Sequence, residues 1–149
     1  PGRIALVGLS MAAYYAPRVA AFDKRVKALI GWSGSYSILD DLYDFCHHLQ
    51  PTVQRLLGGV SDAEARRLLR DFTMAGLAKN ITCPTLITHG AADTLMSVEG
   101  AKRLFSEVGA KDKTLRIYDQ NDVGGRIHCS HDYWAHNVPY MLDWLEERL

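Results

Sequence analysis

Four short apolar runs, separated by segments with helical periodicity, constrain the fold of this chain more than any other feature. The runs cover residues 4–7, 26–31, 84–88 and 114–118. They are too short for helices, and most lack the polar alternation of a half-exposed strand, which is typical of strands buried on both faces of a sheet. Because strands that alternate with helices favour a parallel sheet covered on both faces, the sequence predicts an α/β fold with about four mostly parallel strands.

Helices are predicted between these strands and after the last one. The predicted helices are residues 11–22, 40–57, 61–72, 98–108 and a final helix that opens at Pro139. Pro17 and Pro51 are expected to kink or interrupt the first two helices. Ser61 precedes Glu64 with the spacing of a capping box, which predicts a helix start. The buried face of the final helix is expected to contain Val138, Leu142, Leu145 and Leu149.

Composition excludes several classes of protein. The chain has 149 residues, which fits one domain, and its formal net charge is zero, so it lacks the basic character of nucleic-acid-binding proteins. No apolar run approaches the roughly 20 residues of a membrane-spanning helix. Its three cysteines, Cys46, Cys83 and Cys129, are too scattered for a disulfide framework, which favours a cytoplasmic protein. A strand that begins at residue 4 predicts a fragment, whose N-terminal part precedes Pro1.

The segment Gly8-Leu9-Ser10-Met11-Ala12 lies between the first predicted strand and the first predicted helix. It is close to the G-x-S-x-G pattern of a nucleophile elbow, a sharp turn that lifts a serine hydroxyl above the sheet. The N–H of Met11 would then point toward a developing oxyanion at the start of the helix. The alternative is that Ser10 is a small residue or cap at a helix start. Its position directly after a buried strand favours a nucleophile.

A serine nucleophile needs a base, and the base needs an orienting acid, in the chain order Ser, Asp, His. Asp93 lies just past the carboxyl end of the third predicted strand, where sites form in α/β sheets. Its alternative role is a turn or cap before the helix at Val98. Weaker candidates for the acid are Asp40, Asp41, Asp119 and Asp122.

The base is expected in the loop after the last strand, where His128 and His131 compete and His136 follows. His128 lies in a glycine-containing loop and is preferred. The alternative role for His131 is to cap the final helix or to pack against it. A metal site made from these histidines and Cys129 matches no familiar zinc spacing, so no metal is expected. A reactive Cys129 thiol is unnecessary beside a separate serine elbow.

These motifs resemble the C-terminal half of an α/β-hydrolase. The elbow with Tyr15-Ala16-Pro17-Arg18, the turn Trp32-Ser33-Gly34, and His128-Cys129-Ser130-His131 resemble the group of 2,6-dihydropseudooxynicotine hydrolase and fungal polyketide-shortening hydrolases. The resemblance implies Ser10 as nucleophile, Asp93 as acid and His128 as base, without a cofactor. It also implies hydrolysis of a carbon–carbon bond beside a ketone, and a dimer is common in this group. The resemblance further implies that the early strands and a helical cap precede Pro1. Ala12 departs from the usual glycine, and the loop 119–127 is longer than usual.

The leading hypothesis is therefore a serine hydrolase that acts on a small-molecule carbonyl compound, with no nucleic-acid or membrane partner. The same triad serves esterases and peptidases, so these remain alternatives. A third reading is an inactive hydrolase fragment that acts as an interaction module. The aromatic residues Trp32 and Tyr36, with Tyr14 and Tyr15, lie near the active edge of the predicted sheet and are weaker candidates for substrate contact or core packing. An exposed edge strand at residues 4–7 is expected to make the isolated chain associate.

Overall fold

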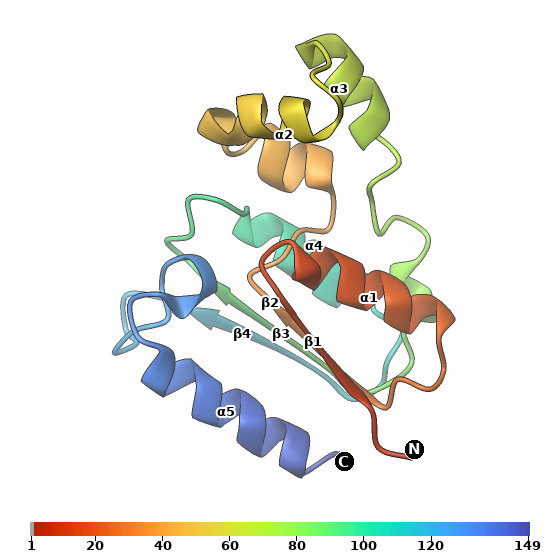
Figure 1. The fold of residues 1–149 in the computed structure, drawn as a ribbon. Coiled ribbons are helices and arrows are strands. Elements are labelled where there is room, and N and C mark those ends of the chain that lie inside the picture. The colour runs from red at the N-terminus through yellow and green to blue at the C-terminus, as the bar shows by residue number, and fades with distance from the viewer. Residues whose placement is uncertain (1) are drawn as a thin grey trace.

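The computed structural model describes residues 2–149, and a four-stranded sheet forms its centre (Figure 1). The strands are β1 (Ala5–Leu9), β2 (Ala28–Trp32), β3 (Thr85–Gly90) and β4 (Lys113–Tyr118). They lie in the order β1-β2-β3-β4, and each neighbouring pair is parallel. This confirms the predicted α/β fold with a parallel sheet, and each predicted apolar run overlaps one strand.

Helices cover both faces of the sheet, as predicted. α1 (Ala12–Phe22) and α4 (Val98–Glu107) lie on one face, and α5 (Trp134–Glu146) lies on the other (Figure 1). Successive residues of a strand point to opposite faces. Leu29 of β2 therefore packs in the cluster beneath α1 and α4, whereas its neighbours Ala28 and Ile30 pack in the cluster beneath α5.

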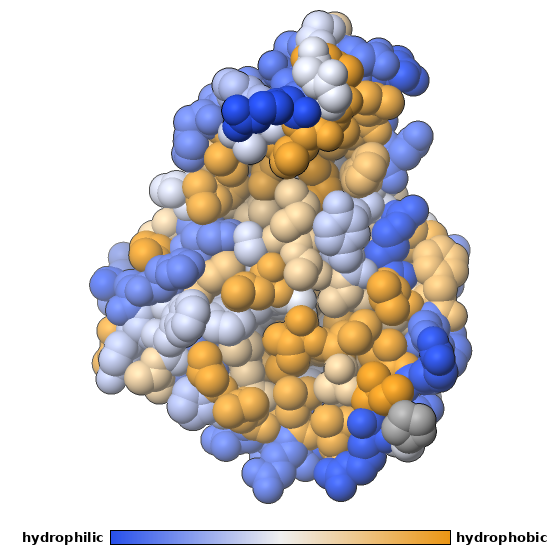
Figure 2. Space-filling model, viewed as in Figure 1, coloured by the Kyte–Doolittle hydropathy of each residue, from blue (hydrophilic) through white to orange (hydrophobic). Residues whose placement is uncertain are grey.

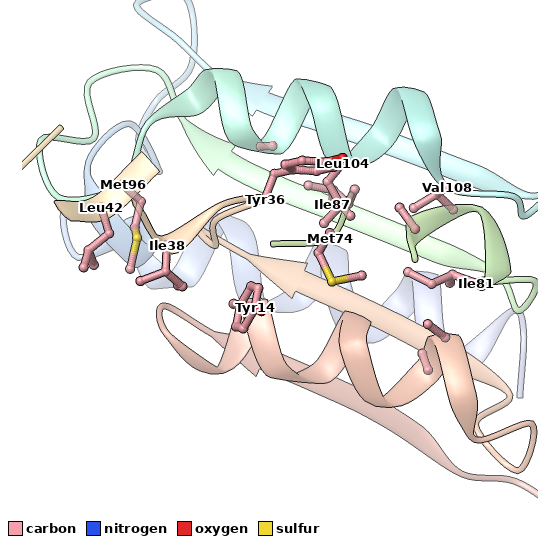
Figure 3. Close-up of a cluster of buried hydrophobic side chains, with 14 of the residues drawn as sticks. Tyr14, Tyr36, Ile38, Leu42, Met74, Ile81, Ile87, Met96, Leu104 and Val108 are labelled. Atoms are coloured by element: carbon pink, nitrogen blue, oxygen red, sulfur yellow. The ribbon is translucent and has the colours of Figure 1, made fainter. Parts of the chain in front are cut away.

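The larger core cluster lies between the sheet and the pair α1 and α4. Figure 3 shows Tyr14 of α1 on one side of this cluster and Leu104 of α4 on the other, with Ile87 of β3 between them. All three side chains are buried. Burying such side chains stabilises a fold by about 1.5–3 kcal/mol each, so this cluster fixes α1, and with it the serine turn, on the sheet.

The segment 39–57 differs from the single interrupted helix that was predicted. It forms a π-helical turn (Leu39–Tyr43), a 3-10 turn (His47–Leu49) and α2 (Gln50–Leu56). Pro51 lies in the first turn of α2, where its missing N–H needs no partner, so it begins a helix rather than interrupting one. α3 (Asp62–Leu69) begins as predicted, because the Ser61 hydroxyl accepts the N–H of Glu64.

Two prolines lie inside helices that continue through them. α1 runs through Pro17, and α5 begins at Trp134, upstream of Pro139, so the predicted start of the last helix was wrong. Its predicted buried face was also partly wrong. The buried residues are Asn137, Met141 and Trp144, whereas Leu142 is 58% exposed. Packing of this face on the sheet stabilises the helix against the hydrogen bond that Pro139 removes.

β1 forms one edge of the sheet, and apolar side chains are exposed along it. Figure 2 shows a broad apolar region there, to which Val7 and Leu9 contribute with exposed fractions of 51% and 39%. Short 3-10 turns also occur at Ala78–Asn80 and His128–Ser130. Within residues 2–149, the helices are all too short or too polar to span a lipid bilayer.

Candidate active site

Ser10 lies in the turn that joins β1 to α1, with a left-handed backbone at φ 57°. A non-glycine residue in this region is strained, and such strain is typical of a nucleophile elbow. The turn is tight on both sides. A Cβ at Gly8 would lie 2.3 Å from the backbone oxygen of Ala12, and the N–H of Ser10 donates to the carbonyl of Trp32 at 2.9 Å. The methyl group of Ala12 itself is exposed, so the turn accommodates this departure from glycine.

Met11 follows Ser10 and immediately precedes the first residue of α1. Among residues 2–149, no backbone carbonyl accepts its N–H, whereas its own carbonyl accepts the N–H of Tyr14. The N-terminus of a helix carries partial positive charge and favours a developing negative charge nearby. The position of this N–H therefore fits the oxyanion donor expected from the sequence.

Asp93 follows the carboxyl end of β3, and its side chain is fully buried. One carboxylate oxygen, Oδ1, accepts the N–H groups of Leu95 and Met96 at 2.8 and 3.0 Å. The other, Oδ2, lies 2.7 Å from Nδ1 of His128. The backbone donors therefore fix the carboxylate so that its second oxygen faces the imidazole.

His128 joins the serine to the acid. Its Nε2 lies 2.8 Å from the Ser10 hydroxyl, while its Nδ1 contacts Asp93. When Nδ1 carries the proton and donates to the carboxylate, Nε2 is free to accept the serine proton. The structure thus brings together the three residues that the sequence singled out, including a pair separated by 118 positions.

The negative charge of Asp93 and the positive charge of protonated His128 stabilise each other. Burial is the largest single influence on the pKa of His128 and lowers it, but the hydrogen bonds and charges of Asp93 and Cys129 together outweigh burial and raise the pKa to about 9. Burial would likewise raise the pKa of Asp93, yet the His128 ring and two backbone N–H groups hold it below its ordinary value. The acid therefore stays ionised and favours the protonated imidazole that forms when Ser10 loses its proton.

The backbone next to His128 is strained and is held by Ser33, a residue with no role in the sequence analysis. Cys129 and Ser130 have left-handed φ angles of 53° and 54°. The buried Ser33 hydroxyl accepts the N–H of Cys129 at 3.1 Å. This bond ties the turn after β2 to the His128 loop. The turn at Trp32-Ser33-Gly34 was visible in the sequence, but its contact with a segment 96 residues away was not.

A second buried network fixes the far side of the same loop. Asn137 of α5 donates through Nδ2 to the Ser130 hydroxyl at 2.8 Å and accepts the Tyr118 hydroxyl at 2.7 Å. All three side chains are almost completely buried. Buried polar groups that satisfy one another hold a single arrangement, so β4 and α5 fix the path of the loop.

Close backbone packing also positions the loop. A Cβ at Gly90 would lie 2.2 Å from the carbonyl oxygen of Arg126, just before His128. The carboxylate of Asp132 accepts the N–H of Arg126 at 3.0 Å. The loop 119–127 is therefore anchored at its end, and its extra length does not displace His128 from Ser10.

The other carboxylates considered for the acid have different contacts. Asp122 pairs with Arg116, and Asp119 accepts the N–H of Asn121. Asp41 is buried, where it accepts the N–H groups of Tyr36 and Ser37, and Asp40 donates its N–H to the Ser37 hydroxyl.

His131 and His136 lie apart from this hydrogen-bonded chain, whereas His89 lies beside its acid. His131 packs against Trp134, and His136 lies against Tyr118. His89 is buried beside the acid, with Nε2 at 3.1 Å from the Met96 carbonyl and 3.4 Å from Asp93 Oδ2. Burial lowers the pKa of His89, which keeps the ring neutral there. Within the described part of the chain, no three His, Cys, Asp or Glu side chains are grouped to hold a metal.

The two aromatic residues proposed to contact substrate are buried in the core instead. Tyr36 is 2% exposed, and its hydroxyl donates to Glu107 at 2.7 Å. Trp32 is 7% exposed and packs edge-on against Trp134. Their side chains cover the sheet, because the strand and turn that carry them are enclosed on both faces. Tyr15 differs, since it is half exposed and lines a small pocket beside Met11.

Comparisons with known proteins agree with this architecture. A family described as serine aminopeptidase, S33, matches residues 63–121. The 2,6-dihydropseudooxynicotine hydrolase of Paenarthrobacter nicotinovorans is 26% identical over 148 residues, which are 98% of this chain and 38% of that protein. The crystal structure of 2,6-dihydroxy-pseudo-oxynicotine hydrolase superposes with a TM-score of 0.80 at 26% identity, covering 98% of this chain and 40% of that one.

More distant structures share the fold. The acylaminoacyl peptidase of Pyrococcus horikoshii has a TM-score of 0.75 at 18% identity, over 99% of this chain and 24% of that one. A monoacylglycerol lipase of Paleococcus ferrophilus has a TM-score of 0.67 at 18% identity, over 99% of this chain and 69% of that one. The chain thus spans about two fifths of the length of its more similar relatives. With its parallel sheet, its serine turn and these matches, the chain has the fold of the C-terminal part of an α/β-hydrolase.

Proposed function

We propose that this chain carries the catalytic triad of a serine hydrolase, with Ser10 as nucleophile, His128 as base and Asp93 as the orienting acid. The single observation that carries the proposal is the position of His128. Its two ring nitrogens contact the Ser10 hydroxyl and the Asp93 carboxylate at 2.8 and 2.7 Å. Such a chain of contacts, in a left-handed turn before a helix, serves to activate a serine hydroxyl.

The chemistry on an ester follows from these contacts. The Ser10 hydroxyl gives its proton to Nε2 of His128 as Oγ bonds to the substrate carbonyl carbon. The carbonyl oxygen becomes an oxyanion near the N–H of Met11. The C–O bond then breaks, the leaving group takes the proton from His128, and a water molecule releases the acyl group by the same steps. Losing one oxyanion donor typically costs about 10²–10³ in rate.

The substrate class proposed first is a small carbonyl compound whose carbon–carbon bond beside a ketone is hydrolysed. This proposal is supported by the resemblance in sequence and by the relative that is 26% identical, whose name is that of a hydrolase of 2,6-dihydropseudooxynicotine. The leaving group would then be a carbon atom, which also needs the proton held by His128. Ester or peptide hydrolysis uses the same residues and is the alternative.

The test is covalent labelling of the protein, expressed with the natural sequence that adjoins residues 1–149. A fluorophosphonate probe is added, and intact mass is measured for the native protein and for Ser10→Ala. The expected result is one adduct that Ser10→Ala loses. The matched control is Ser106→Ala, which removes an exposed serine of α4 and should leave the adduct in place.

Absence of an adduct on a well-folded protein would contradict the triad. An interaction module would then be the better hypothesis.

Cys46, Cys83 and Cys129 are free thiols, which fits the cytoplasmic location that we also propose. We also propose a homodimer, because a dimer is common in the group that the sequence resembles. Light scattering of the same sample tests this proposal.

A further inference from the structure

A small apolar pocket lies beside the serine turn. It has a volume of about 110 Å³, and Met11 and Tyr15 form its wall on the side of α1. Met11 directly follows Ser10, so their Cα atoms are about 3.8 Å apart. The pocket therefore begins one residue from the proposed nucleophile, at the residue whose N–H is the proposed oxyanion donor.

The opposite wall comes from the helices that follow β2. Val53, Leu56 and Leu57, in α2 and at its end, line the pocket together with Leu69 of α3. Figure 1 shows that α2 and α3 stand apart from the sheet, on the side of α1 and α4. These two helices thus enclose a space between themselves and the serine turn.

The chemistry of the lining is uniform. Ile38 and Phe72 complete it, and the described side chains that line the pocket carry no charge. Val53 and Leu69 are buried, whereas Leu56 is 79% exposed, which places Leu56 at the mouth. A pocket of this kind disfavours a charged group, because a charge buried there would lose its hydration without gaining a partner.

We infer that this pocket binds a short uncharged hydrocarbon group attached to the carbonyl of the substrate. The inference rests on the proposed function, since it takes Ser10 as the nucleophile. A dry apolar cavity of about 150 Å³ is known to hold a benzene ring. A pocket of 110 Å³ has about three quarters of that volume and therefore accommodates a chain of about four carbon atoms.

The first experiment measures how kcat/KM depends on chain length. The protein, with its adjoining natural sequence, is given p-nitrophenyl esters from acetyl to decanoyl, and alkyl acetates of matching lengths. Each methylene that enters the pocket should raise kcat/KM about fourfold in one of the two series. The increase should stop when about four carbons beyond the ester group occupy the pocket. A flat profile in both series, or an increase that continues to decanoyl, would overturn the inference.

The second experiment changes the pocket. Leu56→Trp narrows its mouth at an exposed position, and Val53→Phe fills it from within. Each should lower the ratio of pentanoyl to acetyl kcat/KM, or the matching alkyl ratio, about tenfold. The control is Leu142→Trp, another exposed leucine, on the far side of the sheet, which should keep the native ratio. Because Leu56 is exposed, Leu56→Trp still tests the pocket if Val53→Phe folds poorly.

Labelling of Ser10 by the fluorophosphonate probe separates the two proposals. Complete labelling of each variant with an unchanged selectivity ratio would leave Ser10 as nucleophile and refute the pocket as a binding site. The same shift in Leu142→Trp would also refute it. Failure of the native protein to label would refute the proposed function itself.

Discussion

Replacing Asp93 with Asn tests how the triad is held, because it removes one charge and leaves the size of the side chain nearly unchanged. The His128 ring is partly buried, with 14% of its side chain exposed, and burial alone would take its pKa below the ordinary value of 6.5. The Asp93 carboxylate, which lies 2.7 Å from Nδ1, acts with the smaller contribution of Cys129 to raise the pKa to about 9 instead. We expect Asp93→Asn to return the pKa of His128 to about 6.5 or lower.

The expected interaction energy and the expected change in labelling rate both follow from the pKa of His128. A rise from 6.5 to about 9 corresponds to about 3 kcal/mol of interaction with the protonated ring. With this pKa, the fraction of neutral His128 is about 1% at pH 7 and about one half at pH 9. Since only the neutral ring accepts the serine proton, labelling of Ser10 should become about 50-fold faster between these pH values. In Asp93→Asn the labelling is slower throughout and nearly independent of pH above 7.

The assay is an NMR titration of the histidine ring Cε1–H signals. It reports the pKa directly and does not depend on how fast Ser10 is labelled. His128→Gln identifies the His128 signal among the six histidines. A native pKa at 6.5, or one that Asp93→Asn leaves unchanged, would refute the interpretation that the carboxylate sets the protonation of the ring.

The same pair makes stability depend on pH in a defined direction. Because the folded pKa of His128 is raised, its contribution is complete below pH 6.5 and is lost as the pH rises through about 9. The pKa of Asp93 is lowered, so its contribution is present above its ordinary value of 3.8 and is lost as the pH falls through its folded value. Urea unfolding should therefore show a larger cost of Asp93→Asn at pH 6 than at pH 9.5.

Four further substitutions test how the site and the fold are held, and the free energy of urea unfolding is measured for each. Ser33→Ala leaves the buried N–H of Cys129 without its acceptor, which should cost about 1–3 kcal/mol and slow the labelling of Ser10. Gly90→Ala would place a Cβ 2.2 Å from a backbone oxygen of the loop before the proposed base, so it should cost about 1–3 kcal/mol and also slow labelling. Met141→Ala should lower the free energy of unfolding by about 2–5 kcal/mol, because Met141 is buried. Leu142→Ala should change it by less than about 0.5 kcal/mol, because Leu142 is exposed. Equal losses of stability in the two variants would contradict the buried face of α5.

The sequence by itself determined the parts of the molecule that depend on neighbouring residues. Apolar runs predicted the first three strands, and the alternation of Leu115 and Ile117 predicted the fourth. The central strands β2 and β3 are buried on both faces and need such runs, whereas the edge strand β4 is partly exposed. Ser61 predicted the start of α3, since its hydroxyl caps a nearby N–H. The pattern around Ser10 predicted a sharp turn, because small residues on both sides allow a strand and a helix to approach closely.

Only the tertiary structure decided which distant residues meet. Sequence order allowed His128 or His131 as the base, and the contact of His128 with Ser10 distinguishes them. Trp32 and Tyr36 were expected near substrate, yet the packing of helices against both faces of the sheet buries them. These outcomes depend on contacts between residues far apart in the chain, which local patterns do not encode. The Ser33 hydroxyl shows the same limit, because its role exists only where the loop after β4 folds back onto the turn after β2.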